Sequence, residues 1–149
     1  MSMLHNVLAS AAVLAGFVGA AGPSHAAESA AISEAAVKQY LAAWDARDVE
    51  AMLRTLNDDA VVVLPQQAPI KGKDNIRGLL AAFVKEFSQS GSKFASAQLT
   101  ADGPIVYLLW NGDTPSNKYS FGANTFLVRD GRIAYETVAF IAEPKPAQQ

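Results

Sequence analysis

Four segments of alternating apolar and polar residues fill the second half of the chain, and short turns separate them. The segments are KFASAQLT, PIVYLLWN, NKYSFGANTFLVR and RIAYETVAFIA, and the turns are ADG, NGDTPS and DG. Alternation with a period of two is the pattern of a strand that buries one face, and turns this short join neighbouring strands that run in opposite directions. This half of the chain is therefore predicted to form an antiparallel meander.

The first half of the chain carries the pattern of helices instead. Apolar residues recur every three or four positions over residues 37–44 and 49–56, as they do on the buried face of a helix. Ser33 and Asp48 precede these two stretches and are expected to cap the helices. A third helix is predicted over residues 72–87. Its buried stripe is Ile76, Leu79, Leu80, Phe83, Val84 and Phe87.

One apolar strand is expected among the helices, at residues 60–64, after a turn formed by Asn57-Asp58-Asp59. Helices followed by a run of strands indicate the α+β class. A chain of 149 residues, 50% of them hydrophobic, can build one ordinary core. We therefore expect a single α+β domain over residues 27–142, with three N-terminal helices packed on a curved antiparallel sheet. The polar, proline-containing residues 143–149 are expected to form a disordered tail.

The first 26 residues have the pattern of a secretory signal peptide. An apolar run from about Val7 to Ala21 precedes the helix breakers Gly22-Pro23, and small residues flank His25 at the cleavage site. We expect cleavage near Ala26 and a periplasmic or secreted mature protein with no stable membrane association. No Lys or Arg precedes the apolar run, so an uncleaved anchor stays open as an alternative.

Charge and residue usage argue against several kinds of site. The formal net charge is -2 and the twelve Lys and Arg residues are scattered, which is not the pattern of a nucleic-acid surface. The chain has no cysteine, and both histidines, His5 and His25, lie in the segment expected to be removed. The mature chain would then lack the imidazole of a Ser-His-Asp triad or a histidine-based metal site. We expect neither a metal nor a cofactor.

Two stretches carry a resemblance to a known family. They are YLAAWDARDVEAMLRTLNDDAVVVLPQQAPIKGKDNIR and the closing hairpin TFLVRDGRIAYETVAF. In their order and spacing they resemble the nuclear transport factor 2-like superfamily, and in particular its SnoaL-like branch, over roughly residues 33–141. The resemblance implies a cone-shaped fold in which the sheet wraps around a central pocket and the helices close its base. It also implies that this pocket can host very different activities.

The resemblance also suggests where isomerase chemistry would sit. In steroid isomerase members, a helix tyrosine and a strand acid form an oxyanion hole, and a carboxylate just before a proline removes the proton. The matching positions here are Tyr40 for the tyrosine, Leu64 for the base, and a position near Asn124 for the strand acid. Leucine cannot transfer a proton, so isomerase chemistry does not carry over. Leu64 would instead give the pocket an apolar wall.

Glu136 interrupts the otherwise apolar last strand, and its direction depends on the turn before it. A three-residue loop over residues 129–131 pairs Glu136 with Asn124 and points both to the concave side. A two-residue turn pairs Glu136 with Thr125 instead and sends Glu136 and Asn124 to opposite faces. We favour the first by analogy with the family's hairpins. Inside an apolar pocket, desolvation would raise the pKa of Glu136 and suit it to acid-base work, whereas a rim position beside Lys or Arg is the structural alternative.

Three functions follow from these residues. The favoured one is binding of a small, largely apolar molecule, for which a cavity of roughly 300 Å³ or more is expected. The second is an acid-base enzyme of the isomerase, cyclase or hydratase type, in which Glu136 is the catalytic residue and Tyr40 and Asn124 are oxyanion donors. The third is a non-catalytic dimerisation module whose core is filled by side chains. The candidate ligand-binding residues, whose aromatic members could equally be core, are Tyr40, Trp44, Leu64, Trp110, Asn124 and Phe126.

The other face of the last strand is too apolar for free exposure to water. It is expected to carry Ile133, Tyr135, Thr137, Ala139 and Ile141. The resemblance implies that the outer face of the sheet pairs two subunits. We therefore expect a homodimer.

Overall fold

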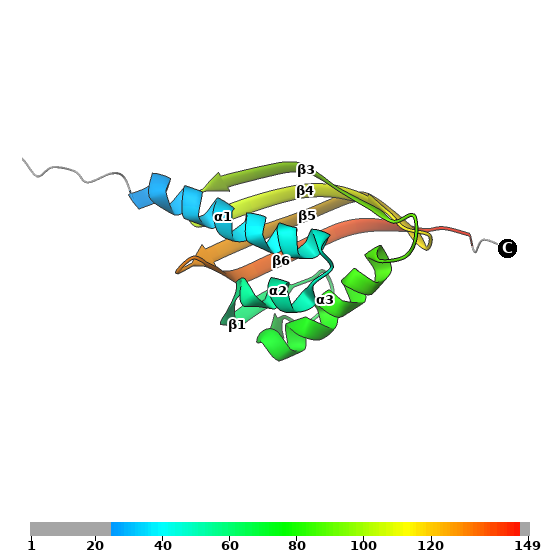
Figure 1. The fold of residues 1–149 in the computed structure, drawn as a ribbon, viewed down its shortest axis with the longest axis horizontal. Helices are drawn as coiled ribbons and strands as arrows, with labels where there is room; N and C mark the ends of the chain where they lie inside the picture. Colours follow the sequence, from blue (N-terminus) through cyan, green and yellow to red (C-terminus); the bar gives the residue numbers. More distant parts are fainter. Residues whose placement is uncertain (1–24, 147–149) are drawn as a thin grey trace, which may run out of the picture.

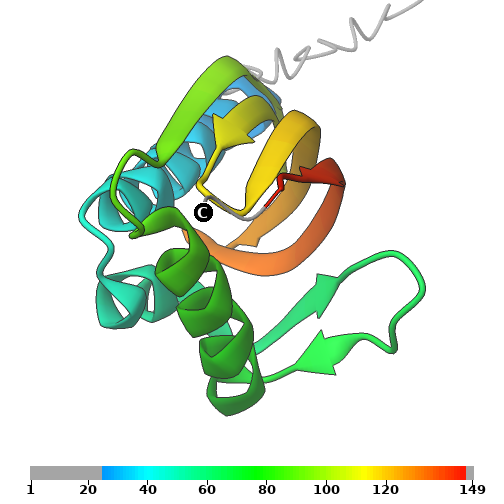
Figure 2. The same cartoon turned by 90° about the vertical axis from the view of Figure 1, so that its right-hand side faces the viewer.

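Three helices cover a curved sheet of six strands in the computed structural model, which describes residues 25–146 (Figure 1). Strands β3 to β6 curl so that the sheet has a concave face, and α1 packs against these four strands (Figure 2). The sheet order is β2-β1-β6-β5-β4-β3. The elements are α1 His25–Asp45, α2 Val49–Arg54, β1 Leu56–Val63, β2 Ile70–Lys71, α3 Lys73–Phe87, β3 Lys93–Asp102, β4 Ile105–Asp113, β5 Asn117–Arg129 and β6 Arg132–Pro144.

The α+β prediction is confirmed, and the meander from β3 to β6 is antiparallel throughout. The sheet as a whole is mixed, because β1 pairs in parallel with β6 and antiparallel with β2. The parallel register places Val62 beside Glu136. Strand β1 also begins earlier than expected, at Leu56, so the predicted turn at Asn57-Asp58-Asp59 is wrong. Both aspartates form ion pairs there, including Asp59 with Arg129 at 2.7 Å.

The helix predictions are confirmed for α3 and for the start of α2, and corrected for α1. Helix α2 ends at Arg54, so Leu56, expected on its buried face, begins β1 instead. Asp48 caps α2 as expected, and its side chain accepts a hydrogen bond of 2.8 Å from the backbone N–H of Ala51. Ser33 does not cap α1, because the helix begins at His25. The hydroxyl of Ser33 instead donates to the carbonyl of Ser29 inside the helix. The preceding stretch is rich in alanine, the best helix former, which lets the helix start earlier.

The hairpin between β5 and β6 differs from both expected registers. Asp130 and Gly131 form a two-residue turn with φ of 54° and 69°, the left-handed conformations that such a turn requires. Ala134 is then an extra residue in β6, between pairs that involve Ile133 and Tyr135. The turn alone would have sent Glu136 outward, and this bulge reverses that. Glu136 therefore lies opposite Phe126 and faces the concave side.

The same bulge and the end of β6 correct two further expectations. Ile133, expected on the outer face, is buried with 1% of its surface exposed, because the bulge turns it inward together with Ala134. Glu143 and Pro144, expected in the disordered tail, pair with β5 as the last residues of β6. The predicted signal peptide lies outside the described residues except for its last two positions, which belong to the first turn of α1. Export stays a prediction.

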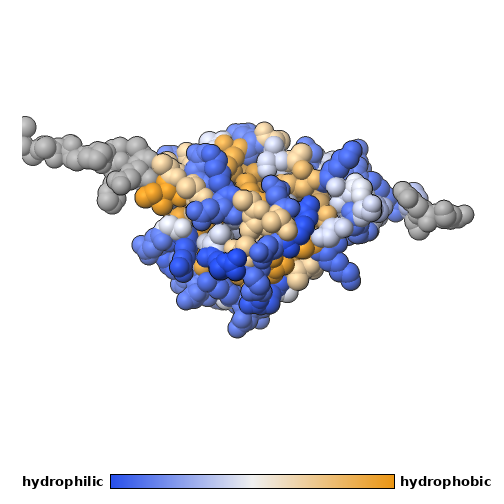
Figure 3. All heavy atoms as spheres, in the orientation of Figure 1, coloured by the Kyte–Doolittle hydropathy of each residue, from blue (hydrophilic) through white to orange (hydrophobic). Residues whose placement is uncertain are grey.

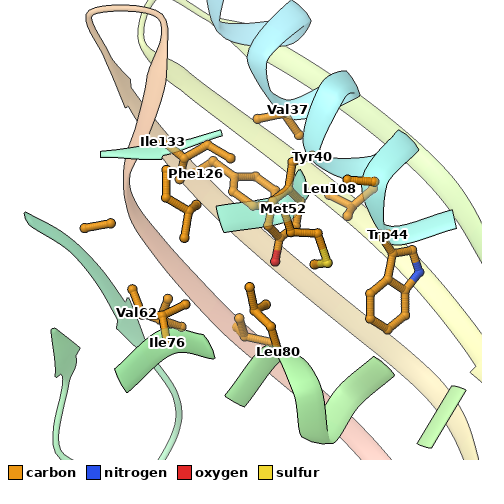
Figure 4. Close-up of a cluster of buried hydrophobic side chains, with 14 of the residues drawn as sticks. Val37, Tyr40, Trp44, Met52, Val62, Ile76, Leu80, Leu108, Phe126 and Ile133 are labelled. Atoms are coloured by element: carbon orange, nitrogen blue, oxygen red, sulfur yellow. The ribbon is translucent and has the colours of Figure 1, made fainter. Parts of the chain in front are cut away.

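The core fills the space between α1, α3 and the concave face of the sheet, and side chains from all three converge there (Figure 4). Apolar residues gather toward the centre of the face that carries the helices, while hydrophilic residues dominate its rim (Figure 3). No helix in the described part of the chain is long and apolar enough to cross a membrane.

Candidate functional site

A cavity of about 60 Å³ lies within this core and is partly open to solvent. Helices α1 and α3 form one side of it, and strands of the concave sheet face form the other. Twelve of its fourteen lining residues are aliphatic or aromatic, and the other two are Asn124 and Glu136. The lining residues are Tyr40, Leu41, Trp44, Val62, Leu79, Leu80, Phe83, Phe87, Phe94, Leu108, Trp110, Asn124, Glu136 and Val138.

A chain of hydrogen bonds ends on Glu136, which is 3% exposed. The indole Nε1 of Trp110 donates to Oδ1 of Asn124 at 2.8 Å, and Nδ2 of Asn124 donates to Oε1 of Glu136 at 2.6 Å. From the opposite side, the hydroxyl of Tyr40 donates to Oε2 of Glu136 in a long contact of 3.5 Å. One carboxylate is thus held by donors from β5 and α1, with β4 fixing the orientation of the amide.

Burial sets the protonation of this group. Removal from water raises the pKa of Glu136 to about 7, although the hydrogen bonds from Asn124 and Tyr40 act in the opposite direction. Burial also raises the pKa of Tyr40, and the nearby charge of Glu136 adds to that rise. Tyr40 therefore stays a phenol donor at neutral pH, while Glu136 is divided between its acid and its carboxylate form.

Aromatic rings build one end of the cavity. Trp44 meets Phe87 and Phe94 edge to face with centroids 5.3 Å apart, and Phe94 lies 5.3 Å from Trp110. Gly122 makes room for this cluster, because a Cβ there would lie 2.0 Å from the ring of Trp110. The indole N–H of Trp44 is buried without a hydrogen-bond partner within the described residues. Arg47 places its guanidinium 4.7 Å from the centroid of the same ring.

Five of the seven residues predicted for the site line the cavity. They are Tyr40, Trp44, Trp110, Asn124 and Glu136. The other two do not. Leu64 is buried in the core just beyond the end of β1, and Phe126 is fully buried beneath Tyr40, at a centroid distance of 5.7 Å. The wall that Leu64 was expected to provide is formed beside Glu136 by Val62 and Val138.

Sequence reasoning missed the contribution of α3 and β3 to the cavity. Leu79, Leu80, Phe83 and Phe87 were expected only as the buried stripe of a helix, and the structure shows that this stripe faces the cavity. The position of Phe94 in the cavity could not be predicted, because the alternating pattern of its segment does not indicate which face of the strand turns inward. A helical period identifies a buried face and leaves its partner undetermined.

Tyr40 and Asn124, the two expected oxyanion donors, both direct a hydrogen to Glu136. Both donors are thus directed at the carboxylate, which is the one carboxylic acid in a cavity with mainly hydrocarbon and aromatic walls. Among the described residues, no group of three or more His, Cys, Asp or Glu side chains is placed to hold a metal ion.

Comparison with known proteins places this geometry in context. The sequence profile of the SnoaL-like domain matches residues 37–136. Among solved structures, a putative ketosteroid isomerase from Kribbella flavida is 21% identical with a TM-score of 0.64, and the match covers 80% of this chain and 85% of that one. A steroid delta-isomerase from Pseudomonas aeruginosa is 23% identical with a TM-score of 0.64, covering 74% and 80%.

A third solved structure belongs to another reaction class. The LEH-like epoxide hydrolase of M. tuberculosis is 22% identical with a TM-score of 0.61, and the match covers 75% of this chain and 84% of that one. No match is found among curated proteins. Identities this low establish the shared fold, and function has to be argued from the site of this chain.

Proposed function

The chain belongs to the SnoaL-like domain family, and from that premise we propose that it binds a small, largely apolar molecule in the cavity between α1, α3 and the sheet. The observation that carries the proposal is the lining itself, in which twelve hydrocarbon or aromatic side chains surround one buried carboxylate. A buried carboxylate costs stability when it ionises, so its place in an otherwise apolar cavity favours a role in holding a ligand.

The size of the cavity limits the ligand. Its volume of about 60 Å³ is well below the roughly 300 Å³ or more expected from the sequence for a ligand-binding cavity, so that expectation is wrong. At roughly 10 to 15 Å³ for each water molecule, the cavity has room for about four to six waters. A cavity of roughly 150 Å³ can enclose benzene, so a molecule with one small ring would extend into the open side of this smaller cavity, and a fused-ring steroid is too large for it.

Intrinsic fluorescence offers a direct test, because both tryptophans of the chain, Trp44 and Trp110, line the cavity. Benzyl alcohol is expected to change the fluorescence saturably as it enters. Leu79→Trp adds bulk where α3 lines the cavity and should weaken binding at least ~10-fold. Because that variant adds a fluorophore, affinities are measured by calorimetry as well as by fluorescence.

The matched control is Ala81→Trp, which adds the same side chain at an exposed position of the same helix. Binding to this variant should equal binding to the wild type. Absence of saturable binding to the wild type, or equal weakening by Leu79→Trp and Ala81→Trp, would reject the proposed function.

We also propose that the chain forms a homodimer through the outer face of its sheet. Large apolar side chains are exposed there, and they include Phe121 at 41%, Tyr135 at 48% and Ile141 at 55%. Phe121 and Ile141 are direct neighbours across β5 and β6, so the exposed surface is continuous. Contiguous apolar surface of this kind supports an interface.

A charge introduced on the exposed apolar surface of that face is expected to separate the subunits. Ile141→Asp should weaken self-association at least ~30-fold, since it places an unpaired carboxylate in an apolar contact. Sedimentation velocity at micromolar concentration measures the shift from dimer to monomer. Ala82→Asp, on the exposed side of α3, should leave the dimer intact. A monomeric wild type would contradict the proposal.

A further inference from the structure

We propose that the ligand of the cavity is a small apolar amine, bound as an ammonium ion by the carboxylate of Glu136 against the aromatic wall. The inference rests on the proposed function, and it adds the chemical class of the ligand. Three features of the cavity carry it: its uncompensated charge, the unused acceptor sites of the carboxylate, and the aromatic rings around it.

The first feature is a buried carboxyl group with no cation among the residues that line its cavity. Glu136 is the one acid among the fourteen lining residues, and none of them is Lys, Arg or His. Glu136 is hydrogen-bonded to the phenol of Tyr40 and the amide of Asn124, and it lies beside Val62 of β1. The α3 residues that line the cavity are all aliphatic or aromatic. All of these are neutral near pH 7. A cationic ligand would therefore supply the positive charge that the lining residues do not provide for Glu136.

The second feature is spare capacity for hydrogen bonds. An ionised carboxylate offers about four acceptor sites, and the described structure fills one on each oxygen. The contact with Tyr40 is long, at 3.5 Å, so Oε2 in particular is weakly satisfied. An ammonium group has three donors and no acceptor, which matches a site that has acceptors to spare.

The third feature is the ring cluster built by Trp44, Phe87, Phe94 and Trp110. Aromatic faces attract cations, and tryptophan does so most strongly. Trp44 makes such a cation–π contact with Arg47, whose guanidinium lies 4.7 Å from the ring centroid. Trp110 is joined to Glu136 through Asn124, so an aromatic wall and the carboxylate belong to one connected site.

Other ligand charges fit the site less well. An anionic ligand would place a second negative charge beside Glu136, and both would be poorly solvated. A neutral alcohol could donate one hydrogen bond and would leave the buried charge without a counterion. A small amine with an apolar ring supplies the opposite charge and covers the hydrocarbon walls.

The amine inference predicts the direction of pH dependence. An alkylammonium keeps its proton well above pH 8, whereas the pKa of Glu136 lies at about 7. Raising the pH from 6 to 8 therefore ionises Glu136 while the ligand stays charged. Affinity for the amine should rise about 10-fold over this interval, and affinity for a neutral ligand should not rise.

The test compares three probes of similar shape with the full chain: benzylamine, benzyl alcohol and benzoate. Calorimetry at pH 8 is expected to give benzylamine at least ~10-fold tighter binding than benzyl alcohol, with benzoate weakest. Glu136→Gln should remove the advantage of benzylamine and its pH dependence. Glu143→Gln, the same change at an exposed position of β6, should preserve both.

Each outcome separates the two proposals. Benzyl alcohol that binds as tightly as benzylamine, and is blocked by Leu79→Trp, would overturn the amine inference and leave the proposed function standing. No saturable binding of any probe would reject both. Should Glu136→Gln fail to fold, the order of the three probes on the wild type at pH 6 and pH 8 decides the question without the variant.

Discussion

Replacing Gly122 by alanine is expected to lower the free energy of unfolding by about 3 kcal/mol, the upper end of the usual cost of overpacking a core. The added Cβ would lie 2.0 to 2.4 Å from three ring atoms of Trp110, which is itself buried. No flexible chain end can yield at this point, so the whole indole has to move. Chemical denaturation in urea measures the loss.

Gly78→Ala is the matched control, because the same substitution should have the opposite sign there. Gly78 lies in the interior of α3, is exposed, and has no atom within 4 Å of the added Cβ. Alanine favours a helix over glycine by about 1 kcal/mol, so this variant should be more stable than the wild type. A Gly122→Ala protein as stable as the wild type would show that the packing of Trp110 is looser than described.

The position of the Trp110 ring also links the stability of the fold to the geometry around Glu136. Trp110 orients Asn124 through Nε1, and Asn124 donates to Glu136. A shift of the indole in Gly122→Ala is therefore expected to disturb the hydrogen bonds of Glu136, although Gly122 itself does not line the cavity. Binding of benzylamine should therefore weaken in Gly122→Ala, along with the fall in the free energy of unfolding.

Local signals were enough to predict α3 and the start of α2, because these features depend on neighbours along the chain, whereas the two-residue strand β2 carries no such signal and was not predicted. The period of α3 and the cap of α2 by Asp48 involve residues within one or two turns, and both predictions are confirmed. The start of α1 was wrong because a serine in a helix-forming context does not have to be a cap. Ser33 bonds inside the helix instead.

The direction of Glu136 was predicted correctly through the wrong register. The sequence contains the Asp130-Gly131 turn in plain form, and a two-residue turn alone would have sent Glu136 outward. The bulge at Ala134 restores the inward direction, and alanine carries no bulge signal. Leu64 and Phe126 were misplaced for a related reason, since only the assembled fold decides which buried residues line a cavity and which pack behind it.

Stability should depend on pH through Glu136, and Glu136→Gln should remove that dependence. Below about pH 4.5 the carboxyl is protonated in both the folded and the unfolded chain. Between pH 4.5 and 7 the unfolded chain releases this proton first, because burial holds the folded pKa at about 7. The folded state therefore loses about 3 kcal/mol relative to the unfolded state as the pH rises through this window, after which the effect levels off.

Urea denaturation of wild type and Glu136→Gln from pH 4.5 to 8.5 measures this effect as a difference, so that contributions from other titrating groups cancel. The stability of Glu136→Gln minus that of the wild type should rise by about 3 kcal/mol across the window. Glu143→Gln, at an exposed position of the same strand, should follow the wild-type curve. Parallel curves for all three proteins would mean that water reaches Glu136, and the cavity would then lack the buried charge on which the amine inference depends.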